Sequence, residues 1–142
     1  MNRLKDLMES NPTFSEWMRA TAAATIEADA LKARGERAKA LALYAEAARL
    51  EYLVWDFLSE EGLHADAMVS LLSCASCWYC ADEPHAARSV AREALEFCGP
   101  KDRRIKARFI ALMSKIEAAL PAARPAGAPT AMEARDAARS SR

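Results

Sequence analysis

The segment GERAKALALYAEA, residues 35–47, decides how the rest of the chain folds. It begins with a glycine, and the apolar side chains of Ala40, Tyr44 and Ala47 then recur at intervals of three and four residues. This spacing places them along one face of an α-helix. Because the charged side chains fall mostly on other faces, the pattern predicts an amphipathic helix that begins just after Gly35.

Outward from this segment, isolated glycines divide the chain into long helical stretches. Gly35, Gly62 and Gly99 each stand between runs with helical apolar spacing, where one helix ends and the chain turns. A short helical start is followed by a break at residues 10–13, and Ser15 or Thr13 is the expected cap of the next helix. No run alternates as a strand does. The sequence predicts an all-α fold with about five main helices, over residues 15–34, 36–60, 63–81, 83–98 and 102–120, the last of which caps the stack.

Size and charge narrow the classes of function. The chain has 142 residues, and its 20 basic and 20 acidic side chains cancel, so no overall field attracts nucleic acid or an anionic membrane. No uncharged apolar run reaches the ~18 residues of a membrane span, and the first residues lack the apolar core of a signal peptide. We expect one helical domain over residues 1–120, a flexible tail rich in alanine, proline and arginine over 121–142, and a cytoplasmic location.

Small and aromatic residues at the expected helix crossings resemble the tetratricopeptide repeat. The first copy comprises Ala28, Leu31, Gly35, Ala40, Tyr44 and Ala47, and the second comprises Leu71, Ala75, Trp78, Ala87 and Ala94. The copies lie 47 residues apart, from Ala47 to Ala94, whereas the family repeats about every 34 residues. Asp82 also replaces the turn glycine of the second copy. A three-helix microtubule-interacting-and-trafficking module has a similar glycine, alanine-leucine and tyrosine pattern, but the helices predicted after residue 62 argue against it.

The tetratricopeptide resemblance implies a fold and a function. It implies antiparallel hairpins stacked in a short array, and a groove along the first helix of each hairpin that binds a protein or peptide. Carried over by alignment, the groove residues are Thr25, Asp29, Lys32, Val69, Leu72, Ser76 and Tyr79. We therefore expect a non-catalytic adaptor or accessory subunit without a cofactor, whose partner the sequence does not identify. A phosphate-binding glycine loop, a nucleophile elbow and an HExxH motif are all missing from the sequence, so we expect no enzymatic activity.

Four cysteines raise an alternative function. Cys74, Cys77 and Cys80 form a CxxCxxC motif, with Cys98 further along the chain, and similar spacings occur in zinc and iron–sulfur sites. On a helix, however, Cys74 and Cys80 lie about 9 Å apart along the axis, which is too far for both to bind one ion. We expect free thiols that pack in the core and no bound metal. A metal- or redox-responsive helical protein remains the alternative.

Five basic residues gather at the start of the last predicted helix, an end where the helix dipole disfavours positive charge. They are Lys101, Arg103, Arg104, Lys106 and Arg108. An acidic partner or nucleic acid could dock there, but we expect a solvated face balanced by nearby Asp82, Glu83 or Glu93. Because no aromatic residues interleave for base stacking, we do not expect a nucleic-acid partner.

Large rings cluster in the second and third long helices. Residues 50–58 are apolar on almost every side of their helix, and residues 67–81 carry no formal charge. One neighbouring hairpin is not expected to cover all of these rings, and monomers seldom expose such a patch. We therefore expect a homodimer or a larger hetero-complex, whose interface contains Tyr52, Trp55, Phe57 and Trp78.

Overall fold

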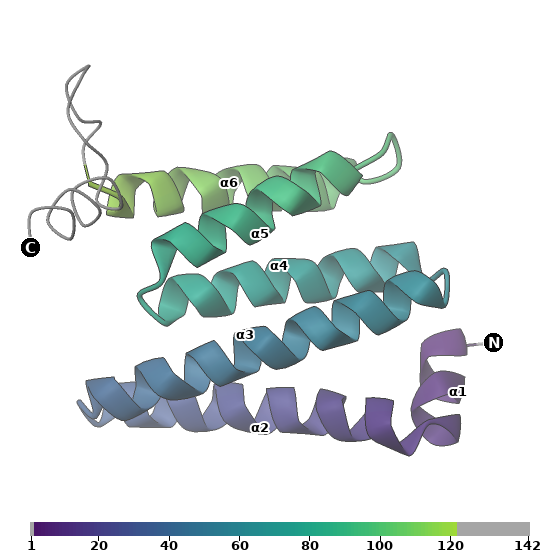
Figure 1. The fold of residues 1–142 in the computed structure, drawn as a ribbon, viewed down its shortest axis with the longest axis horizontal. Helices are drawn as coiled ribbons and strands as arrows, with labels where there is room; N and C mark the ends of the chain where they lie inside the picture. The colour runs from purple at the N-terminus through teal and green to yellow at the C-terminus, as the bar shows by residue number, and fades with distance from the viewer. Residues whose placement is uncertain (1, 122–142) are drawn as a thin grey trace, which may run out of the picture.

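The computed structural model describes residues 2–121, which form six α-helices and no strand (Figure 1). The helices are α1 (Arg3–Ser10), α2 (Pro12–Ala33), α3 (Arg37–Glu60), α4 (His64–Cys80), α5 (Pro84–Phe97) and α6 (Arg103–Ala119). The all-α prediction is confirmed, and α1 is the short helical start. From residue 122 onward, the segment predicted to be a flexible tail lies outside the described residues.

The helices stack as antiparallel hairpins in two layers. Each helix packs against the next one in the chain, and α3 and α5 cross in front of α2, α4 and α6 (Figure 1). Within the rear layer, α4 packs against α6, whereas α2 and α4 make few direct contacts. The rear layer is therefore closed between α4 and α6 and open between α2 and α4.

Three turns between helices share one hydrogen-bonding pattern. At the first turn, the amide of Gly35 donates to the carbonyl of Lys32 and the next amide donates to Leu31. The turns at Gly62 and Asp82 repeat this pattern, which is the Schellman motif that closes a helix C-terminus. All three residues have positive φ, at 78°, 74° and 60° in chain order. Asp82 thus takes the position of a turn glycine, as the resemblance implied.

The start of α2 corrects the predicted cap. The side-chain oxygen of Asn11 accepts a hydrogen bond from the amide of Phe14, and Pro12 occupies the first turn, where a missing N–H costs nothing. Ser15 is instead buried inside the helix, where its hydroxyl accepts from the guanidinium of Arg19 at 2.8 Å. The helix therefore begins three residues before the predicted position because asparagine, rather than serine or threonine, caps it.

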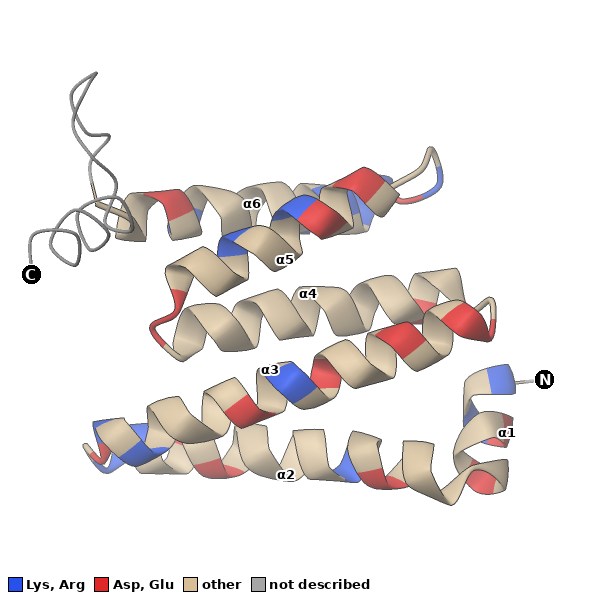
Figure 2. Cartoon of the chain, in the orientation of Figure 1, with Lys and Arg blue, Asp and Glu red and all other residues tan. Residues whose placement is uncertain are grey.

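Alanine allows the helices of this fold to approach closely. Ala28, Ala47, Ala75, Ala87 and Ala94 are each fully buried, as expected for residues at helix crossings. Larger core side chains, such as Leu71, Phe109 and Ile116, fill the space between crossings. Figure 2 shows that α4 carries almost no charge along its length, which fits its central place in the array.

Candidate binding groove

The main cavity of the described residues lies between α2 and α4, on the open side of α4. Its volume is about 630 Å³, within the usual range for ligand sites. Tyr44 and Glu51 of α3 contribute to it, and Arg108 reaches it from α6. The remaining lining residues come from α2 (Met18, Thr21, Ala22, Thr25, Ile26 and Asp29) and α4 (Val69, Ser70, Leu72, Ser73, Ser76, Cys77 and Cys80). We call this cavity the groove.

Five of the seven predicted binding residues line the groove. These are Thr25, Asp29, Val69, Leu72 and Ser76. Leu72 is nevertheless buried, so it contributes to the wall more than to the open surface. The alignment with the tetratricopeptide repeat therefore assigned to one site residues of two helices that line the same cavity.

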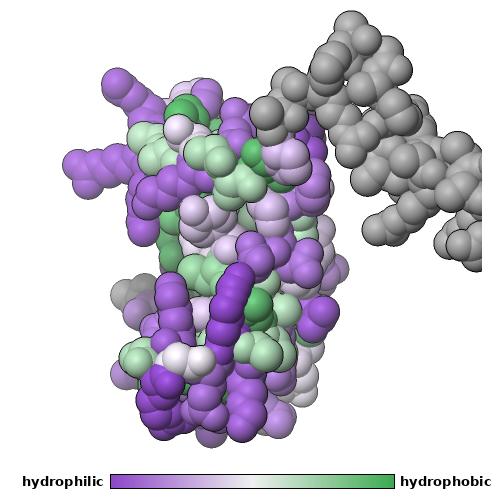
Figure 3. Space-filling model, turned by 90° about the vertical axis from the view of Figure 1, so that its left-hand side faces the viewer, coloured by the Kyte–Doolittle hydropathy of each residue, from purple (hydrophilic) through white to green (hydrophobic). Residues whose placement is uncertain are grey.

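The other two predicted residues, Lys32 and Tyr79, line a second cavity of about 440 Å³. Tyr44 and Cys80 line both cavities, so the second continues the groove towards the hairpin turns. Arg37, Asp82 and Ala119 also border this second cavity. Figure 3 looks at this end of the molecule, where hydrophilic residues at top and bottom flank a more apolar middle.

Hydroxyl groups along α2 present oxygen acceptors to the groove. The hydroxyl of Thr21 donates to the carbonyl of Trp17 at 2.8 Å, and that of Thr25 donates to the carbonyl of Thr21 at 2.9 Å. Because these hydroxyl protons are already used, the oxygens keep only lone pairs for a ligand. The hydroxyl of Tyr44 likewise donates to the carboxylate of Asp29.

Glu51 is the acidic residue among the groove residues that were not predicted from the sequence. It lies on α3, and burial raises its pKa to about 7, against the lowering effect of a hydrogen bond with Ser70. A carboxylate in such a place lacks the solvent that normally stabilises its charge. The available signal was an acid inside the apolar run of residues 50–58, which also contains Asp56. Only the position of α4 shows that this acid faces a cavity.

Three branched aliphatic side chains of the rear layer are exposed, and two of them line the groove. Ile26 of α2 is 71% exposed, Val69 of α4 is 53% exposed, and both line the groove. Ile110 of α6, the third helix of the same layer, is 54% exposed. Each helix of the rear layer thus carries one uncovered branched aliphatic residue.

Burial disfavours the thiolate form of the cysteines, most strongly for Cys74 and Cys77. Burial raises the pKa of Cys74 and of Cys77 to about 12, and it also raises the pKa of Cys80 and Cys98. A thiolate is the form that binds metal or attacks a disulfide, so these environments suppress both reactions. Among the described residues, no three histidine, cysteine, aspartate or glutamate side chains are placed to hold one metal ion.

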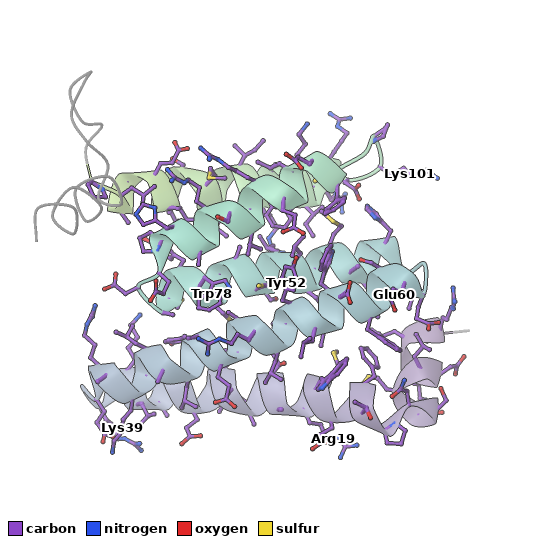
Figure 4. The ribbon with its side chains drawn as sticks, in the orientation of Figure 1. Arg19, Lys39, Tyr52, Glu60, Trp78 and Lys101 are labelled. Atoms are coloured by element: carbon purple, nitrogen blue, oxygen red, sulfur yellow. The ribbon has the colours of Figure 1, made fainter. Side chains whose placement is uncertain are left out.

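The predicted interface rings are mostly covered by the chain itself. Phe57 stacks on Phe14 with ring centroids 4.6 Å apart, in a cluster that residues of α1 help to cover. The ring of Trp78 lies 5.4 Å below the guanidinium of Arg49 and packs against the core. Tyr52 and Trp78 lie where α3, α4 and α5 meet (Figure 4). Residues of α1 pack around Phe57, and α5 borders Tyr52 and Trp78, but Tyr52 stays 37% exposed. The expected interface through these rings therefore stays a prediction.

A smaller ring cluster remains partly exposed on α3 and α5. The ring of Trp55 lies 4.9 Å from that of Tyr52 and 5.7 Å from that of Phe97. We call these three residues the ring cluster. The hydroxyl of Tyr52 donates to the carboxylate of Glu93 at 3.0 Å, so the edge of the cluster is tied to α5. The oligomeric state stays a prediction.

In the described part of the chain, the acids expected to balance the basic residues at the start of α6 form no ion pair with them. Asp82 pairs with Arg37 at 3.0 Å, and Glu93 accepts from Tyr52, so neither balances the cluster. Within residues 2–121, none of the five basic side chains forms an ion pair. Asp102, in the same loop, instead accepts from the amide of Gly99 and contacts His64 at 2.8 Å.

Comparison with known proteins assigns no family to the chain, so a functional argument rests on the groove. No protein-family model matches the chain, and neither curated proteins nor solved structures show significant similarity to it. No described helix has the length and apolar character needed to cross a membrane.

Proposed function

We propose that the chain is a non-catalytic adaptor or accessory subunit that binds a segment of a partner protein in the groove. The observation that carries this proposal is the open groove itself, with Ile26 and Val69 exposed at its wall. Burial of such aliphatic groups by a partner is favourable, at roughly 25 cal/mol for each Å² removed from water.

The shape of the groove favours a polypeptide over a compact metabolite. The lining residues of the two joined cavities run along α2 from Met18 to Lys32. At 1.5 Å for each helical residue, this corresponds to a trough about 21 Å long. A partner helix of three to four turns has a similar length.

The position of the groove also supports the tetratricopeptide-like interpretation. That family binds its partners along the first helix of each hairpin, and α2 and α4 are the first helices of the two hairpins here. The first hairpin is long, with helices of 22 and 24 residues, which accounts for a spacing between copies beyond that of the family.

Site-directed crosslinking in an extract of the native source tests this function. A photoreactive amino acid at the exposed position Ile26 should capture a defined partner, whereas the same group at Phe97, in the ring cluster, should not. Capture of the same protein from both positions would contradict binding in the groove.

A matched pair of substitutions then tests the groove without a crosslinker. Ser76→Phe fills the groove wall, whereas Ser89→Phe adds the same ring to an exposed position on α5. We expect Ser76→Phe to abolish retention of the partner and Ser89→Phe to retain it. Equal retention by the two variants, at equal helical content, would rule out the groove as the binding site.

A further inference from the structure

Several polar groups that line the groove are left as acceptors of hydrogen bonds, whereas the serines of α4 and Arg108 can still donate. Thr21 and Thr25 have given their hydroxyl protons to backbone carbonyls, and Tyr44 has given its proton to Asp29. Glu51 adds a second carboxyl group beneath the cavity. A ligand that fits such a lining must bring donors of its own.

The charges of the groove are also unbalanced. Two carboxyl groups, on Asp29 and Glu51, line it together with one guanidinium, on Arg108. Arg108 is exposed and forms no ion pair with a carboxylate of residues 2–121. The groove therefore has one negative charge in excess when both carboxyl groups are ionised.

From these two features we infer that the groove binds a lysine side chain of the partner segment, with its ammonium group at the carboxylate of Glu51. This inference rests on the proposed function and specifies the chemistry of the partner. The four-carbon stem of lysine matches the apolar walls at Ala22 and Val69. Its ammonium has three donors and no acceptor, which complements a ring of hydroxyl and carboxylate oxygens.

A compact ammonium fits this lining better than a guanidinium. Arginine achieves its strongest contacts when its planar fork meets one carboxylate through two parallel bonds. The oxygens of the lining belong to separate residues, with Glu51 on α3 and the hydroxyl groups of Thr21 and Thr25 on α2. Lysine donors rotate about a single centre, so they can reach separate acceptors.

Binding of the ammonium should depend on pH through Glu51. Its pKa is raised to about 7 by burial, so its carboxyl group is largely neutral at pH 5.5 and ionised at pH 8. Burial holds the thiols of Cys77 and Cys80 and the hydroxyl of Tyr44 in protonated forms over this range. The charged or ionisable groups that line the groove with Glu51 are Asp29 on α2, Tyr44 on α3, Cys77 and Cys80 on α4, and Arg108 on α6. Cys74 on α4 lies outside this lining, but the charge of Glu51 contributes to its raised pKa.

The probe for this inference is n-hexylammonium, with n-hexanol as its uncharged match. Each is titrated into the full-length, ¹⁵N-labelled chain, and dissociation constants are measured from the amide shifts of Thr25, Ser73 and Ser76. We expect n-hexylammonium to bind about tenfold more tightly than n-hexanol at pH 8. We expect that preference to disappear at pH 5.5.

Substitution of the carboxyl group completes the test. Glu51→Gln should weaken n-hexylammonium binding about tenfold at pH 8 and leave n-hexanol binding unchanged. Glu93→Gln changes the carboxyl group that accepts a hydrogen bond from Tyr52, and it should alter the affinity for neither probe. Equal binding of the two probes, or full n-hexylammonium affinity in Glu51→Gln, would overturn the lysine site. The proposed function would survive that result if Ser76→Phe still abolished partner retention, and would fail if it did not.

Discussion

The groove and the ring cluster are two ways in which this fold brings apolar residues to its surface. In the ring cluster, Trp55 packs between Tyr52 and Phe97, and a hydrogen bond to Glu93 ties the cluster to α5. In the groove, the aliphatic groups of Ile26 and Val69 line an open cavity. The comparison indicates that the rings pack within the array, whereas the groove stays open and, under our proposal, takes a partner.

The largest expected effect separates stability from binding. Trp55→Ala removes the central ring of the cluster and should lower the free energy of unfolding by about 3 kcal/mol, measured by urea denaturation. At temperatures where it stays folded, this variant should retain the partner fully. Ser76→Ala in the groove should change stability by less than about 0.5 kcal/mol. A Trp55→Ala variant that is as stable as the parent chain would contradict a stabilising role of the ring cluster.

Thiol reactivity gives the next largest difference. Cys80 is exposed at the end of the groove, whereas Cys74 and Cys77 are buried with pKa values raised to about 12. Iodoacetamide at pH 8 should therefore modify Cys80 on the order of a hundredfold faster than Cys74 or Cys77. Timed alkylation with peptide mass spectrometry measures the rates, and Cys80→Ser should remove the fast phase. Rapid modification of Cys74 would show that α4 opens readily and is not a rigid wall.

Glu51 should make stability depend on pH. In the unfolded chain its carboxyl group loses its proton near the ordinary pKa of 4.5, whereas in the folded chain it keeps the proton to about pH 7. As the pH rises through this window, the unfolded state ionises first, so the free energy of unfolding falls by about 2 kcal/mol, with allowance for residual solvation.

Glu51→Gln cannot ionise, so it should lack this fall and exceed the parent chain in stability by about 2 kcal/mol above pH 7. Urea denaturation at pH 5 and pH 8 measures the effect. Glu93→Gln, at the ring cluster, should follow the parent profile. Parallel profiles for the parent chain and Glu51→Gln would mean that solvent reaches this carboxyl group freely.

The smallest effect concerns the cation above Trp78. The ring of Trp78 lies 5.4 Å from the guanidinium carbon of Arg49, and the Arg49 side chain is exposed. Arg49→Gln should cost about 0.5 kcal/mol of stability, and Arg49→Lys should cost less because it keeps the charge. Thermal unfolding compares the two variants. A loss above about 2 kcal/mol would show that Arg49 also holds the α3 and α4 packing together.

The helices could be predicted from the sequence because their ends carry local signals. Glycine at positions 35 and 62 adopts positive φ at the predicted turns, and Pro84 stands in the first turn of α5. The predicted start of α2 was wrong because Ser15, an acceptable cap, lies near Asn11, which forms the actual cap. Local signals of equal strength compete there, and only the folded chain shows which one is used.

The walls of the groove could be predicted in part, and its base could not. Thr25, Asp29, Val69 and Ser76 follow from the tetratricopeptide resemblance, whose alignment assigns one face of each first helix to the groove. Glu51 and the exposed Ile110 depend on how three helices pack, which periodicity does not determine. The contacts that cover Phe57 were not predicted for the same reason, because they come from Phe14 and from α1.

The measurement that tests the central claim most directly is chemical-shift mapping of the ¹⁵N-labelled chain. The chain is titrated with the partner that was captured by the photoreactive amino acid at position Ile26. We expect the amides of Thr25, Asp29, Val69 and Ser76 to shift and saturate together, while those of Trp55 and Phe97 stay in place. Shifts centred on Trp55 and Phe97, with the groove amides unchanged, would contradict the account.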